Sequence, residues 1–348
     1  MRIAMLSTPF VAVPPKDYGG TELVVAQLTN GLVARGHDVT LFATGDSRSA
    51  AVVRWLYDTA QWPPNPIVDF NHVTWALREV QFGEFDLVHA HSAAGLALQR
   101  WLPEVPMVYT LHHDRDETLS SYYQYFPSTA FVAISADQAR RETRLPDVTV
   151  IHHGLDPREF EWTNEPGDYV AFVGRFAPVK GAHTAIDAAE AAGVSIRLAG
   201  AVHEIDREFG EREMAQRLRR AHVTHLGMIG IDAKRPLLRD ARALLAPIEW
   251  AEPFGVILIE AMLSGCPVVA YPNGSVTELV EPGVTGYVVR DVREMAAVIR
   301  PGSVLDGFDR GRCRARAIER FGSDRMVAAY AAVYERVAQS ARRPLLIA

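Results

Sequence analysis

Short apolar runs alternate with amphipathic segments along residues 1–160 of the 348-residue chain. The apolar runs of strand length are 3–7, 39–43, 87–90, 108–111, 131–134 and 148–151. Between the first two runs, Val25, Leu28 and Leu32 recur at helical spacing and predict a helix over 21–35. Apolar strands separated by helices are typical of a parallel sheet covered on both faces. This part of the chain is therefore expected to form a parallel α/β domain.

A second alternation of the same kind occupies the rest of the chain. It predicts a strand over 169–173 and a helix over 181–192. Further apolar runs of strand length are 196–198, 243–246 and 268–270. The stretch 200–226 is rich in Glu and Arg, and it is expected to form one charged helix. The repeated pattern predicts a second doubly wound α/β domain.

Turn residues fill 154–167, and the domain boundary is placed in this segment. We expect one Rossmann-like domain over 1–160 and another over 161–325. A last amphipathic helix begins near Asp324 and is expected to cross between the domains, with 326–348 packing back on the first. Ligands bind at the carboxyl ends of parallel strands, so two facing domains are expected to hold a ligand in the cleft between them.

Composition and charge exclude several classes of protein. The chain is 48% hydrophobic and 22% charged with a net charge of −6, and acidic residues outnumber basic ones in 1–160. This balance argues against a nucleic-acid partner and gives no support to peripheral membrane contact. The longest apolar runs are far below the ~20 residues that a membrane-spanning helix needs, and we expect neither a membrane-spanning segment nor export by a classical signal. Two cysteines, Cys266 and Cys313, cannot form a zinc cluster alone, and a cytoplasmic location is expected.

The most informative segment begins at Glu252. Pro253 and Gly255 interrupt regular structure before Val256, so Glu252 is expected in a loop and Glu260 inside an apolar helix. A helix start offers unpaired N–H groups and a partial positive charge to a phosphate. Carboxylates on either side can accept hydrogen bonds from hydroxyls. A phosphate flanked by hydroxyls is the outline of a sugar nucleotide.

The ordinary alternative is a capping glutamate followed by a solvated one. The residues around Glu260 disfavour it, since Ile257, Leu258, Ile259 and Ala261 make this helix largely apolar. A carboxylate on a buried helix needs a partner or a function.

Two cations lie in the loop after the first strand of the second domain. Arg175 can grip two phosphate oxygens and Lys180 adds a point charge, which together suit a diphosphate. The alternative is a pair of ordinary surface cations. The chain has only three lysines, Lys16, Lys180 and Lys234, and this scarcity favours function for a lysine that remains.

A glycine pair opens the first predicted helix. Gly19 and Gly20 allow backbone to approach a ligand at a positive helix end, although a plain turn is the commoner reading of such a pair. The fingerprint of a nicotinamide dehydrogenase is missing.

These motifs are distributed over nearly the whole chain. They are Gly19–Gly20, Thr110–His112, Gly174–Arg175, Lys180–Gly181, Glu252–Glu260 and Gly286. Together they resemble the family 4 retaining glycosyltransferases of GT-B architecture. The resemblance implies that the first domain binds the acceptor and the second domain binds the sugar-nucleotide donor.

The resemblance also assigns roles to individual residues. It implies that Arg175 and Lys180 bind the donor diphosphate, that Glu252 contacts sugar hydroxyls and that Glu260 holds the ribose. His112, rather than the next histidine, matches the position that touches the donor sugar and supports positive charge at its anomeric carbon. The other implied donor contacts are Gly19, Gly20, Met228, Phe254, Gly255 and Val256.

Several histidines and acids suggest a metal site at first sight. They occur as His89-Ala90-His91, as Asp114 and Asp116 after His112, and as His152-His153. Their spacing is not diagnostic of a metal site. The resemblance implies a metal-independent enzyme without a cofactor, in which Arg175 and Lys180 supply the positive charge.

The expected reaction is transfer of a sugar from a UDP- or GDP-sugar to a hydroxyl of a small-molecule or glycan acceptor. The resemblance points to retention, and since no carboxylate is clearly placed as a nucleophile, we expect same-face attack. The alternative is a sugar-nucleotide epimerase or hydrolase on the same architecture. A catalytically silent binding protein is disfavoured because Arg175, Lys180, Glu252 and Glu260 are all present.

Overall fold

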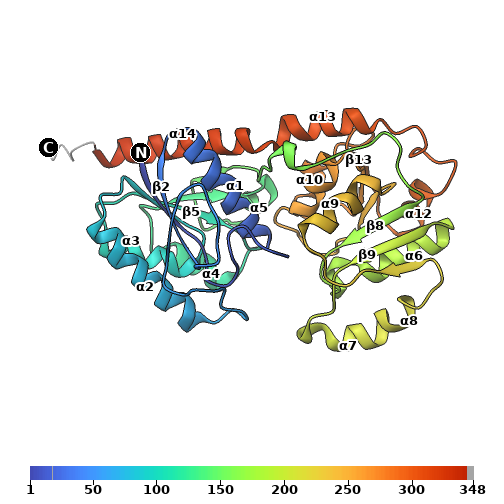
Figure 1. The fold of residues 1–348 in the computed structure, drawn as a ribbon, viewed down its shortest axis with the longest axis horizontal. Helices are drawn as coiled ribbons and strands as arrows, with labels where there is room; N and C mark the ends of the chain where they lie inside the picture. The colour runs from blue at the N-terminus through green and yellow to red at the C-terminus, as the bar shows by residue number, and fades with distance from the viewer. Residues whose placement is uncertain (18, 343–348) are drawn as a thin grey trace. The chain divides into compact units, whose positions relative to one another are not determined.

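The computed structural model describes residues 1–17 and 19–342, and its elements are labelled in Figure 1. The tail 343–348, which the sequence placed with the last helix, lies outside the described residues. The chain forms two compact units: unit 1 contains Met1–Gly154 and the chain from Ser323, and unit 2 contains Leu155–Gly322.

The unit boundaries lie before those placed from the sequence at 160–161 and 325–326. The reason for the first difference is a backbone pairing. Leu155 donates its N–H to the carbonyl of Phe321 at 3.0 Å and forms a parallel bridge with Gly322, so 155–160 joins unit 2.

Unit 1 is built on a seven-stranded parallel sheet with the order β3-β2-β1-β4-β5-β6-β7. Its strands are β1 (Arg2–Leu6), β2 (Asp38–Ala43), β3 (Val52–Trp55), β4 (Leu87–Ala90), β5 (Met107–Leu111), β6 (Ala130–Ala133) and β7 (Val148–Val150). The sequence predicted six of them and missed β3. This strand lies at the sheet edge with most of its side chains exposed, so it lacks the apolar run of a buried strand.

The helices of unit 1 include the first and the last of the chain. They are α1 (Gly20–Ala34), α2 (Pro66–Phe82), α3 (Leu98–Trp101), α4 (Glu117–Tyr123), α5 (Ala136–Arg141) and α14 (Ser323–Arg342), with a 3₁₀ turn at Ala93–Ala97. In Figure 1 α14 lies beside α1. Gly31 allows this approach, because a Cβ there would lie 2.4 Å from Cγ2 of Val327.

Unit 2 repeats the topology with six parallel strands in the order β10-β9-β8-β11-β12-β13. Its strands are β8 (Tyr169–Val173), β9 (Ser195–Ala199), β10 (Val223–His225), β11 (Leu244–Ala246), β12 (Val268–Ala270) and β13 (Gly286–Val288). Its helices are α6 (Ala182–Ala192), α7 (Arg207–Phe209), α8 (Ala215–Arg217), α9 (Ile231–Asp240), α10 (Val256–Leu263), α11 (Val276–Leu279), α12 (Val292–Ile299) and α13 (Arg310–Phe321).

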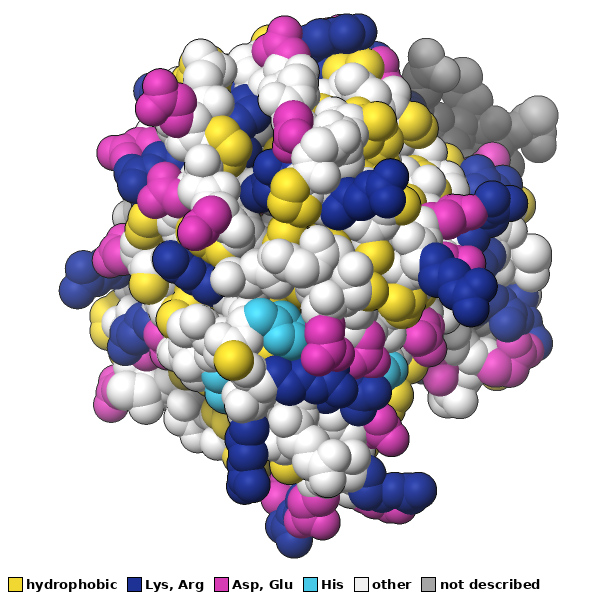
Figure 2. Space-filling model, turned by 90° about the vertical axis from the view of Figure 1, so that its right-hand side faces the viewer, with side chains coloured by type: hydrophobic (Ala, Val, Ile, Leu, Met, Phe, Trp, Pro, Cys, Tyr) yellow, Lys and Arg dark blue, Asp and Glu magenta, His cyan; other side chains and the backbone are white. Residues whose placement is uncertain are grey.

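The prediction of a single charged helix over 200–226 was wrong. Short 3₁₀, α and π turns occupy 204–217, and the edge strand β10 follows them. Two arginines of this stretch pair with an acid of α6: Arg217 lies 2.9 Å and Arg220 2.7 Å from Asp187. The face drawn in Figure 2 likewise shows basic and acidic side chains interspersed.

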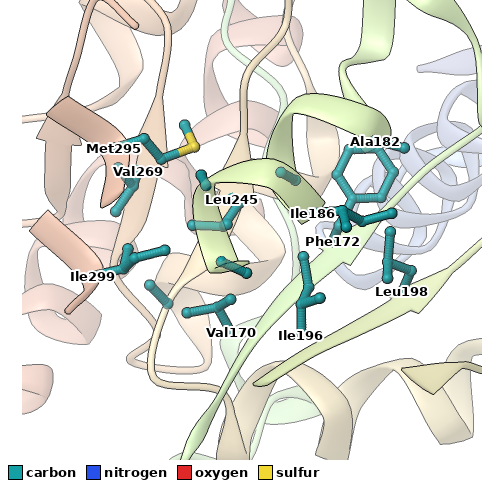
Figure 3. Close-up of a cluster of buried hydrophobic side chains, with 14 of the residues drawn as sticks. Val170, Phe172, Ala182, Ile186, Ile196, Leu198, Leu245, Val269, Met295 and Ile299 are labelled. Carbon is teal, nitrogen blue, oxygen red and sulfur yellow. The ribbon is translucent and has the colours of Figure 1, made fainter. Parts of the chain in front are cut away.

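The core of unit 2 lies between its sheet and helices α6 and α12. Figure 3 shows Val170 of β8, Ile196 of β9, Ile186 of α6 and Met295 of α12 among the side chains of one buried cluster. Each of these four side chains is fully buried, which stabilises the fold by roughly 1.5–3 kcal/mol per side chain. This packed layer holds the strand ends, and therefore the loops after them, in fixed positions.

Among the residues that the structure describes, no helix combines the length and apolarity that a membrane crossing requires.

Candidate functional site

The loop from β8 to α6 carries the two predicted cations of unit 2. It ends at Gly181, whose φ of 77° places it in the left-handed region before α6. A Cβ at Gly181 would lie 2.2 Å from the carbonyl oxygen of Pro247, in the loop after β11. The two loops therefore touch at a position where only glycine fits.

Lys180 pairs with Glu252, and Trp250 completes the contact. The Lys180 Nζ atom donates to Oε2 of Glu252 at 2.5 Å, and Trp250 Nε1 donates to the same oxygen at 2.8 Å. Lys180 Nζ also lies 4.9 Å from the centroid of the Trp250 ring. Within the described chain, Oε1 of Glu252 has no hydrogen-bond partner. The carboxylate is thus held by one oxygen and offers the other to a ligand.

Arg175 is held separately from this group. Its Nε atom lies 3.5 Å from Oδ2 of Asp206, a distance at the limit of hydrogen bonding. The Arg175 side chain is one-third exposed. Such a loosely held guanidinium remains available to an anionic ligand.

The start of α10 has the geometry that the sequence predicted. Gly255 precedes the helix with φ 80° and ψ 70°, and no side chain caps the first turn from Val256. The loop before it is held by Ser275, the residue that precedes α11, whose Oγ donates to the carbonyl of Phe254 at 2.7 Å. The amide dipoles at this helix start are therefore fixed in direction near Glu252.

Glu260 lies inside α10 and is only 2% exposed. Its Oε1 atom accepts a hydrogen bond of 2.6 Å from Nζ of Lys234 on α9. A buried carboxylate with this partner is neither a helix cap nor a solvated surface residue. The sequence did not predict a role for Lys234, although the scarcity of lysine in the chain was a signal.

Met228 lies in the loop between β10 and α9 and is 51% exposed.

The glycine pair of unit 1 starts α1 as expected. Gly19 is the N-cap and Gly20 the first helical residue, without a side-chain cap. Close by, the buried Glu22 accepts a hydrogen bond of 3.0 Å from Thr8 Oγ1, and burial raises the pKa of Glu22. A Cβ at Gly19 would lie 2.8 Å from Oε2 of Glu22. Glu22 was not among the residues singled out from the sequence, although it is an acid in the first turn after the glycine pair.

His112 follows the last residue of β5 and contacts two other histidines. Its Nε2 atom lies 2.8 Å from Nδ1 of His91, and its ring stacks on His153 with centroids 5.6 Å apart. Burial, followed by the proximity of His91 and His153, lowers the pKa of His112 well below its ordinary value. His112 is therefore neutral at physiological pH.

The other residues that suggested a metal site have structural contacts. Asp114 pairs with Arg141, and Asp116 caps α4 by accepting the Leu119 N–H at 2.9 Å. In residues 1–17 and 19–342, no group of three or more His, Cys, Asp or Glu side chains is arranged to hold a metal ion.

Two family descriptions match consecutive parts of the chain. Residues 18–159 match Glycosyltransferase Family 4, and residues 158–301 match Glycosyl transferases group 1. The chain belongs to the family 4 type of glycosyltransferases. The family expected from the sequence is confirmed, and the enzyme is a glycosyltransferase.

A curated relative of this glycosyltransferase is glycogen synthase from Mycobacterium tuberculosis. The two sequences are 27% identical over 99% of this chain and 97% of the relative.

Solved structures show the fold of the glycosyltransferase. AviGT4, a glycosyltransferase involved in avilamycin A biosynthesis, has a TM-score of 0.75 and 25% identity, with 98% of each chain covered. HepE from Anabaena, determined in complex with UDP-glucose, has a TM-score of 0.75 and 21% identity, with 97% of this chain and 100% of HepE covered. The predicted α/β GT-B class with two Rossmann-like domains is confirmed.

Proposed function

We propose that this glycosyltransferase moves a sugar from a nucleoside diphosphate sugar to an acceptor hydroxyl with retained anomeric configuration, without a metal or another cofactor. The observation that carries the proposal is the arrangement of Glu252 and Glu260 in unit 2. Each carboxylate is held by a lysine through one oxygen, and an uncapped helix start separates them. Carboxylates for hydroxyls around a positive helix end suit a sugar nucleotide.

In this proposal the donor binds mostly to unit 2. Arg175 and Lys180 bind the diphosphate, and Oε1 of Glu252, which has no partner in the part of the chain that the structure describes, accepts a hydrogen bond from the sugar. Glu260 accepts from the ribose hydroxyls, and Met228 lies against the nucleobase. The backbone at Gly19, Gly20, Phe254, Gly255 and Val256 supplies further donor contacts. A UDP-sugar is the first donor to test, because the similar HepE was determined with UDP-glucose.

The proposed chemistry uses the donor's own phosphate as the base. The bond between the anomeric carbon and the diphosphate oxygen breaks, and the acceptor oxygen attacks from the same face. The acceptor proton passes to the departing phosphate, whose developing charge Arg175 and Lys180 stabilise. Unit 1 supplies His112 for the donor sugar and binds a small-molecule or glycan acceptor.

Thermal-shift measurements with UDP-, GDP- and ADP-sugars test donor binding, because a ligand that binds only the folded state raises Tm. The expected result is a rise with one nucleotide class that Glu260→Gln abolishes. Product analysis by NMR is then expected to show retained configuration and unchanged activity with a chelator. Release or epimerisation of the sugar without any acceptor, or dependence on added manganese, would refute the proposed reaction.

A further inference from the structure

His91 lies in the middle of a line of three side chains in unit 1. It follows β4, and its ring is 2% exposed. Its Nε2 atom lies 3.1 Å from the sulfur of Met5, and its Nδ1 atom lies 2.8 Å from Nε2 of His112. Both ring nitrogens of His91 are therefore in contact with a polar atom.

These two contacts determine where the hydrogens lie. A thioether sulfur accepts hydrogen bonds and has none to donate, so the hydrogen in the Met5 contact belongs to Nε2 of His91. A neutral imidazole carries a single N–H, and Nδ1 of His91 is then an acceptor. His112 must donate its Nε2–H to it.

The opposite assignment conflicts with the geometry. If Nδ1 of His91 donated to His112, a bare Nε2 lone pair would face the sulfur lone pairs at 3.1 Å. A doubly protonated His91 is disfavoured as well, because burial and the neighbouring His89 lower its pKa well below the ordinary value.

The ring of His112 is also fixed on its face by His153. The two rings are inclined by only 22°, and His153 is itself buried. Among the described residues, Nδ1 of His112 has no hydrogen-bond partner.

We propose that His91 is a positioning residue that holds His112 in the Nε2–H tautomer, so that His112 presents Nδ1 as a hydrogen-bond acceptor for a hydroxyl of the donor sugar. The inference rests on the proposed function for its second half, the contact with the sugar. It adds a rule of specificity: the group that faces Nδ1 must donate a hydrogen. A hydroxyl satisfies this rule and a carboxylate does not.

Two substitutions of His91 separate its hydrogen bond from its packing. Asn places a carbonyl oxygen near the position of Nδ1 and keeps an acceptor for His112, whereas Leu fills space without one. His89→Asn is the matched control, since His89 is also a buried histidine, lies within β4, and contacts Tyr334 at 2.7 Å and Thr110 at 2.8 Å through its ring nitrogens instead of His112.

The tautomer of His112 is read from ¹⁵N side-chain NMR of the ligand-free protein. We expect protonated Nε2 and bare Nδ1 in the wild type, His91→Asn and His89→Asn, and a mixture of tautomers in His91→Leu. The kcat/KM for the donor is expected to fall about tenfold in His91→Leu and to be largely restored in His91→Asn, as for one orienting hydrogen bond.

Two results would overturn the positioning role: a wild-type His112 protonated on Nδ1, or a His91→Leu spectrum identical to that of the wild type. The sugar contact has its own readout. Adding the donor is expected to shift the His112 Nδ1 resonance, and adding the nucleoside diphosphate alone is not. An unshifted resonance in a protein that transfers sugar would refute the contact, and failure of transfer with every donor would refute the proposed function while the tautomer is still measured.

Discussion

Replacing Trp250 by Phe removes the indole N–H from the Glu252 site and keeps an aromatic ring there. The N–H of Trp250 donates to Oε2 of Glu252 at 2.8 Å, and the ring lies 4.9 Å from Nζ of Lys180. Phe retains a π face for Lys180, and Lys180 retains its pairing with Glu252. The substitution therefore isolates one hydrogen bond to a carboxylate.

The expected loss of kcat/KM in Trp250→Phe follows from the strength of the hydrogen bond between Trp250 and Glu252 and from its surroundings. Hydrogen bonds to charged groups contribute about 1.5–3 kcal/mol. The lower end applies here, because Oε2 keeps its second donor and the Lys180 side chain is 21% exposed. A loss of about 1.4 kcal/mol corresponds to a tenfold fall in kcat/KM for the donor. Affinity for the nucleoside diphosphate alone should stay within about twofold of the wild-type value, since in the proposed function Glu252 contacts the sugar.

The assay compares initial rates over a range of donor concentrations with calorimetric titration of the nucleoside diphosphate. Trp162→Phe is the matched control, because Trp162 lies in unit 2 between Gly265 and Gly311, away from Glu252. An unchanged kcat/KM in Trp250→Phe, or an equal loss of nucleotide affinity, would refute the argument that Trp250 orients Glu252 for the sugar.

Three further predictions follow from the geometry. Gly181→Ala should lower the free energy of unfolding by about 2 kcal/mol or more, seen as a lower urea midpoint, because its Cβ would clash with Pro247 at φ 77°. Arg175→Ala should lower kcat by ~10²-fold at nearly unchanged Tm; an unchanged kcat would contradict its role at the phosphate. Burial lowers the pKa of His89 and of His153 in the folded protein to about 3. In the unfolded chain the same histidines have the ordinary pKa of 6.5, so between pH 6.5 and pH 3 the unfolded chain binds protons that the folded protein does not. The free energy of unfolding should therefore fall as the pH drops below 7, by about 2 kcal/mol for each of these histidines at pH 5 and about 3 kcal/mol at pH 4; a flat profile of urea midpoints against pH would contradict this.

The elements that the sequence predicted best are those whose burial is complete. The predicted strand 169–173 matches β8 in both bounds, because a short apolar run between turn residues is typical of a buried strand and the turn residues mark its ends. The edge strands β3, β10 and β13 were missed, since short strands that are only partly buried carry no such run. Local pattern also placed Glu252 in a loop and Glu260 in a helix.

The side chains that contact the site residues could not be predicted from the sequence. Lys234 lies 26 positions before Glu260, and only the packing of α9 against α10 brings the two side chains together. The contact of His91 with His112 depends likewise on the register of β4 and β5. The rarity of lysine and the repeated histidines drew attention to these residues in the sequence. Their contacts with residues far along the chain can be read only from the folded structure.

The return of the chain to unit 1 at Ser323 has a consequence for biosynthesis. Tyr330 and Tyr334 of α14 are fully buried in unit 1, where they contact Thr110 and His89. The ribosome completes the whole of Leu155–Gly322 before it delivers these tyrosines. The unit that is synthesised first is therefore the last to finish folding, and a nascent chain carries an open histidine-lined face until its final helix emerges. Shortening the C-terminal end would damage the N-terminal half of the enzyme.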